Sequence, residues 1–104
     1  MRRIRYAGGS FLTGDAEADA VMRYAAALAN VDRAATLTVN GRSEGGEVAE
    51  FVLLVGPASQ VIVEPVDDEF DLPPAEDFIA DVEQRIGELT WRPDPIGGSF
   101  LDDL

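Results

Sequence analysis

The densest run of carboxylates in the chain is Asp67-Asp68-Glu69-Phe70-Asp71. Carboxylates clustered on a loop can bind Ca²⁺ or Mg²⁺, but an EF-hand loop also needs a central glycine and a distal glutamate. The run has neither of these at the required spacing. We therefore predict a solvated connector here, with no metal site and no cofactor.

A second candidate is the glycine-rich stretch at positions 8–15, which lies between an expected strand and an expected helix. Helix N-termini attract phosphate. The stretch contains no Lys or Arg and fits neither G-x-G-x-x-G nor a P-loop. Asp15, Glu17 and Asp19 fill the first turn of the helix, where acids are favoured and would repel a phosphate. We predict a tight connection, with Thr13 or Asp15 as the helix N-cap.

Thiolate and imidazole chemistry is excluded by composition, because the chain has no Cys and no His. Two carboxylates can divide acid and base roles only where their environments separate their pKa values. The acids here fall in loops and first turns, where water surrounds them. We do not expect an enzyme. A small-ligand or carboxylate-dependent site stays open as an alternative, and a deep pocket lined by Tyr24, Arg5 and an acid would favour it.

The charge balance also argues against two kinds of partner, nucleic acids and anionic membranes. Twenty acids face eight arginines, with no lysine, so the net charge is −12. That charge repels phosphate backbones and anionic lipid, and direct nucleic-acid binding needs a basic face. No apolar run approaches the roughly 18 residues of a membrane span, and no apolar stretch follows the N-terminal arginines. We expect no membrane association and a cytoplasmic protein.

The elements that must position any site follow from hydrophobic periodicity. We expect one α+β domain over residues 1–90, followed by a Pro/Gly-rich acidic C-terminal tail at 91–104. Alternation predicts strands at 2–7, 34–40, 48–55 and 60–64, the last two joined by Gly56-Pro57-Ala58-Ser59. Apolar stripes predict helices over 16–29 and 73–89. The predicted order is β-α-β-β-β-α, a four-stranded, mainly antiparallel sheet with both helices on one face.

From the first helix onward, this order of helix, three strands and helix resembles that of the double-stranded-RNA-binding domain. The resemblance is one of topology. Acids and alanines stand where that family has a basic helix start, so its RNA function does not carry over.

The strand at 48–55 is apolar on both sides. Phe51 and Leu53 share one face, and Val48, Val52 and Leu54 share the other with Glu50. If both helices cover one face of the sheet, the second face needs a partner. We predict an interface at Val48, Glu50, Val52 and Leu54, and a homodimer as the simplest partner.

Three classes of function remain. The favoured one is a non-enzymatic protein–protein interaction module that acts as a homodimer and presents an acidic surface to a basic partner protein. The second is a nucleic-acid mimic that regulates a basic protein through Asp67, Asp68, Glu69, Asp71, Glu76 and Asp77. The third is the ligand-binding or enzymatic alternative above.

One repeat is also present in the chain. Gly-Gly-Ser-Phe-Leu occurs at 8–12 and again at 97–101. Chance is the first explanation. The alternative is that the tail competes with, or pairs beside, the first copy in a neighbouring subunit.

Overall fold

A computed structural model describes residues 1–67, 70 and 72–90. Seven elements follow in order: β1 (Arg2–Tyr6), β2 (Gly9–Thr13), α1 (Asp15–Asn30), β3 (Ala35–Ser43), β4 (Val48–Val55), β5 (Val61–Pro65) and α2 (Glu76–Thr90). The strands form one antiparallel sheet in the order β4-β3-β2-β1-β5. The α+β class and the antiparallel sheet are confirmed.

The predicted strand count of four and the order β-α-β-β-β-α are wrong. The extra strand, β2, lies in the glycine-rich stretch that was predicted to be a tight connection. It pairs along its whole length with β1 through a two-residue turn at Ala7 and Gly8, both of which have positive φ (51° and 86°). That geometry is a type I′ hairpin turn, whose twist suits antiparallel strands.

The pairing of the last strand also differs from the expectation. The two strands joined by Gly56-Pro57-Ala58-Ser59, β4 and β5, do not form a hairpin. β4 is one edge of the sheet, and β5 crosses to the opposite edge, where it pairs with β1. The resemblance to the RNA-binding domain therefore extends to the order of elements along the chain but not to the sheet.

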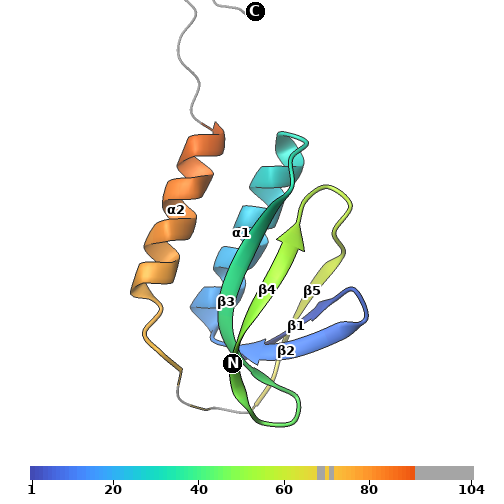
Figure 1. The fold of residues 1–104 in the computed structure, drawn as a ribbon, viewed down its shortest axis with the longest axis vertical. Helices are drawn as coiled ribbons and strands as arrows, with labels where there is room; N and C mark the ends of the chain where they lie inside the picture. Colours follow the sequence, from blue (N-terminus) through green and yellow to red (C-terminus); the bar gives the residue numbers. More distant parts are fainter. Residues whose placement is uncertain (68–69, 71, 91–104) are drawn as a thin grey trace, which may run out of the picture.

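The hydrophobic core lies between the helices and one face of the sheet. Figure 1 shows α1 and α2 side by side on that face. Its sheet residues are Ile4, Phe11, Leu37, Val39, Leu53 and Val55, its α1 residues are Ala18, Ala20, Val21, Tyr24 and Leu28, and α2 adds Val82. Arg23 of α1 pairs with Glu83 of α2 across the helix interface.

β2 pairs with β3 only at Arg42 and Ser43, so the sheet splits beyond this point. Side chains satisfy carbonyl groups of β3 along the split. The Thr13 hydroxyl donates a hydrogen bond to the Asn40 carbonyl oxygen (2.7 Å), and Arg85 donates to that of Thr36 (3.1 Å). The bond to the Asn40 carbonyl is partly buried, where a backbone polar group needs such a partner. This bond also removes Thr13 as the predicted N-cap.

The N-cap of α1 is Gly14, and no side chain caps it. Asp15, the other predicted cap, instead pairs with the N-terminal amine (3.2 Å) and with Arg2 (3.4 Å). No helix within the described ranges is long and apolar enough to cross a membrane.

Candidate functional site

The face of the sheet opposite the helices has a polar half and an apolar half. The polar half is an ion-pair network, defined here as Arg3, Arg5, Ser10, Glu44 and Glu64. Arg3 contacts Glu44 (2.8 Å) and Glu64 (3.2 Å), and Arg5 also contacts Glu64 (2.9 Å). The Ser10 hydroxyl donates to Glu44 (2.7 Å). Arg3 and Arg5 of β1 are thus balanced by one carboxylate on the edge strand β5, Glu64, and by one in the β3–β4 turn, Glu44.

The network holds its two carboxylates in the charged form. Hydrogen bonds from Arg3, and then from Arg5, lower the pKa of Glu64 below its ordinary value. Hydrogen bonds from Arg3, and then from Ser10, lower the pKa of Glu44 in the same way. Glu44 is exposed and Glu64 is partly exposed, and both are already paired with arginine, as in an ion-pair network at a protein surface.

The apolar half is the β4 patch, defined as Val48, Val52 and Leu54. These side chains are 53%, 67% and 58% exposed, and each belongs to the same face of an edge strand. The predicted interface residue Glu50 lies among them and is also exposed. Their in-register neighbours on β3 are Arg42, Thr38 and Thr36. The four predicted interface residues are therefore brought together on one surface.

Next to the β4 patch, Arg42 of β3 packs on an aromatic ring. The Arg42 guanidinium lies 4.4 Å from the centroid of the Phe70 ring, a cation–π distance. Arg42 Nε is buried and has no hydrogen-bond partner in the described part of the chain. Phe70 thus anchors the connection between β5 and α2 against β3.

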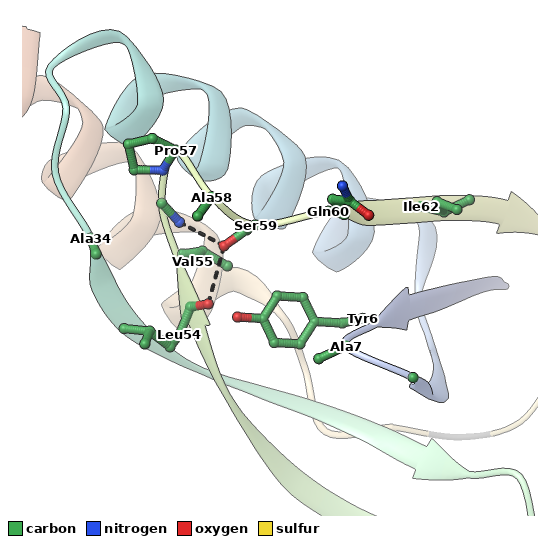
Figure 2. Close-up of a pocket in the computed structure, with 12 residues that line it drawn as sticks. Tyr6, Ala7, Ala34, Leu54, Val55, Pro57, Ala58, Ser59, Gln60 and Ile62 are labelled. Carbon is green, nitrogen blue, oxygen red and sulfur yellow. Dashed lines mark hydrogen bonds between the residues drawn. The ribbon is translucent and has the colours of Figure 1, made fainter.

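A cleft opens where β4 gives way to the 56–60 connection. It has a volume of about 550 Å³ and is lined by 12 residues (Figure 2). They come from the end of β1, the β1–β2 turn, Ala34 before β3, β4, the 56–60 connection and β5. None of the 12 is charged. Figure 2 shows the Tyr6 hydroxyl pointing across the cleft toward Leu54. Tyr24 and Arg5, which a ligand site was expected to use, do not line it.

The wall of the cleft is fixed by Ser59. Its hydroxyl accepts a hydrogen bond from Gly56 N–H (2.9 Å) and donates to the Leu54 carbonyl (3.3 Å), and its N–H bonds to Gly56 O (3.0 Å). Both hydrogen bonds of the hydroxyl are made to the backbone of the turn, and no basic side chain that the structure describes is hydrogen-bonded to it, so Ser59 is not arranged as an activated nucleophile. No signal in the linear sequence marked this cleft, because its walls come from separate segments that meet only after β5 crosses the sheet.

The predicted acidic partner surface is only partly described. Asp67, Glu76 and Asp77 are exposed, whereas Asp68, Glu69 and Asp71 lie outside the described residues, as does the second Gly-Gly-Ser-Phe-Leu copy at 97–101. The first copy forms the turn residue Gly8 and most of β2. Among the residues that the structure describes, no group of three or more acids is placed to hold a metal ion.

Comparison with protein-family models, curated proteins and solved structures finds no match to this chain.

Proposed function

We propose that the chain is a non-enzymatic protein–protein interaction module that acts as a homodimer through the β4 patch. The observation that carries this proposal is the exposure of Val48, Val52 and Leu54, each more than half accessible on one face of an edge strand. Soluble proteins protect long apolar edges, commonly with Lys, Pro or a bulge. β4 runs for eight residues and contains neither Lys nor Pro.

A second copy fits this strand because the patch complements itself. In an antiparallel β4–β4 pair with Val52 opposite the partner's Leu54, the four aliphatic side chains form one cluster. The register that places Glu50 opposite the partner's Glu50 would bring like charges together, which is unfavourable. The ion-pair network beside the patch carries balanced charges, so it adds little repulsion between copies.

The size of the patch sets the expected affinity. A stable interface buries about 800 Å² on each partner, more than three aliphatic side chains supply. The remainder comes from backbone pairing over residues 51–55, the part of β4 that lies opposite the partner's β4 in this register. We therefore expect a reversible dimer with a dissociation constant in the micromolar range.

Single-cysteine crosslinking locates the surface directly, because the chain has no native cysteine. Val52→Cys and the matched control Met22→Cys both replace exposed apolar residues, one on β4 and one on α1. A short bifunctional maleimide should link Val52→Cys chains into dimers and leave Met22→Cys chains monomeric. Equal crosslinking of both variants, or of neither, would contradict the proposal.

The acidic alternative is supported by a separate observation. Asp67, Glu76 and Asp77 are exposed and form no ion pair with other described residues. A surface of this kind suits a basic protein that otherwise binds phosphate backbones. Capture of such a protein, with release by salt as screening requires, would support this role; binding that Glu76→Gln/Asp77→Asn leaves unchanged would count against it.

A further inference from the structure

We propose that the cleft between the β1–β2 turn and the 56–60 connection binds a small, uncharged, mainly aromatic molecule that carries one hydrogen-bonding group. This site is proposed independently of the dimer, although Leu54 belongs both to the cleft lining and to the β4 patch. Ligand sites in proteins are concave, mostly apolar and about 300–1,000 Å³ in volume. The cleft, at about 550 Å³, lies within that range.

The lack of charged residues around the cleft determines which class of ligand fits it. The chain carries 28 charged residues among 104, yet none of the 12 residues that line the cleft is charged. An anion would meet no basic group there and would approach a molecule of net charge −12. A cation would meet no counter-charge inside and would lose its hydration. A neutral molecule meets neither penalty.

The shape of the cleft is preformed. Ser59 closes the turn with the three hydrogen bonds given above. Gly56 is buried against the neighbouring segment so closely that a Cβ there would lie 2.9 Å from Ala34 Cβ and 2.9 Å from Arg33 O. Pro57 restricts the backbone further. Ordering this wall would therefore cost little free energy when a ligand binds.

Three polar side chains line the cleft, those of Tyr6, Ser59 and Gln60, and the Tyr6 hydroxyl is the group that can orient the ligand. The Tyr6 hydroxyl faces the space (Figure 2), and it makes no hydrogen bond to another described residue. A tyrosine hydroxyl in apolar surroundings takes a partner when water is displaced. The aliphatic side chains of Leu54 and Ile62 line the cleft and are exposed, so they offer apolar contact for a ring.

The test uses two fluorescent probes with the same ring system. N-phenyl-1-naphthylamine is neutral, and 1-anilinonaphthalene-8-sulfonate adds one sulfonate. Titrated into the full-length protein, the neutral probe should bind at least about 10-fold more tightly, because the sulfonate would be desolvated without a cation partner. Equal affinity for both probes, or no binding of the neutral one, would overturn the proposal.

Variants locate the probe. Ala58→Phe places a ring in the cleft and should lower the affinity for the neutral probe at least 10-fold, whereas Ala26→Phe, on the exposed face of α1, should leave it unchanged. Tyr6→Phe removes one hydrogen bond and should lower the affinity by about 5-fold. Circular dichroism verifies the fold of each variant. The titrations are made below the concentration at which dimers form, because Leu54 lines the cleft and also belongs to the β4 patch. Binding insensitive to Ala58→Phe, or binding seen only when dimers form, would show that the cleft is not a ligand site.

Discussion

Phe11 of β2 and Phe51 of β4 stack with ring centroids 4.3 Å apart and planes inclined by 7°. The rings come from strands on opposite sides of β3 and meet beside Gly41, whose added Cβ would lie 2.9 Å from the Phe11 ring and 2.5 Å from the Leu12 carbonyl oxygen. The absence of a side chain at Gly41 therefore allows the two halves of the sheet to join.

Gly41→Ala should destabilise the protein by about 1–3 kcal/mol, because the methyl group overpacks a site bounded partly by backbone. Urea unfolding measures the change. Gly45→Ala is the matched control, since a Cβ there approaches only Ser43 Oγ, at 3.8 Å. A loss no larger than that of the control would show that the stack does not depend on Gly41.

Ala7 occupies a left-handed backbone conformation with φ of 51°. This conformation costs a non-glycine residue about 1–2 kcal/mol, and asparagine tolerates it better. Ala7→Asn should therefore raise the free energy of unfolding, by about 0.5–1 kcal/mol, because asparagine suits a type I′ turn. Thermal unfolding would detect this as a higher Tm; an unchanged or lower Tm would refute the turn assignment.

Gly87 lies inside α2, and a Cβ there would meet no atom within 4 Å. Glycine is less favourable than alanine in a helix by about 0.8–1.0 kcal/mol. Gly87→Ala should stabilise the protein by about this amount in urea unfolding. Destabilisation instead would mean that α2 packs more tightly around this position than the structure shows.

The ion-pair network makes stability depend on pH in a defined direction. The folded state lowers the pKa of Glu64, so the stabilisation is present above the ordinary value of 4.5 and is lost as pH falls through the lower folded value. The stability difference between the wild type and Glu64→Gln should therefore shrink as pH falls below about 4.5.

The exposed Glu47, which forms no ion pair among the described residues, supplies the control for that measurement. The difference between the wild type and Glu47→Gln should be smaller than that for Glu64→Gln at neutral pH. Parallel pH profiles for the two variants would argue that general charge repulsion, not the network, governs acid unfolding.

Periodicity predicted both helices and four of the five strands because each has an apolar stripe or alternation of its own. The spacing of Asp81 and Arg85, one helical turn apart on α2, suits an ion pair, and Arg85 Nε lies 3.0 Å from Asp81 Oδ2. The alternation in β4 likewise placed Leu53 in the core and Val52 on the exposed face. These features depend on local sequence, so the sequence alone sufficed.

The missed features depend on long-range contacts. Only two of the five residues of β2 are large and apolar, Phe11 and Leu12, and its two polar residues each lie next to a glycine. The turn before it contains Ala-Gly, whereas Asn-Gly would have been a recognisable hairpin signal. It is a strand because β1 pairs with it and Phe51 packs on Phe11. The crossing of β5 depends on Val63 joining Ile4 and on Glu64 joining Arg3. No local sequence pattern indicates at which edge of the sheet a strand will pair.

Sedimentation velocity of the wild-type protein over a concentration series tests the proposed interface most directly, with Val52→Glu and the matched Met22→Glu as variants. Both replaced side chains are exposed, at 67% and 39%, so neither substitution should unfold the monomer. We predict that the wild type and Met22→Glu shift from 11.2 kDa monomers toward dimers at micromolar concentrations. Val52→Glu should stay monomeric, because it would bury unpaired carboxylates in the interface. A wild-type protein that remains monomeric throughout, or a Val52→Glu variant that dimerises equally well, would contradict the account.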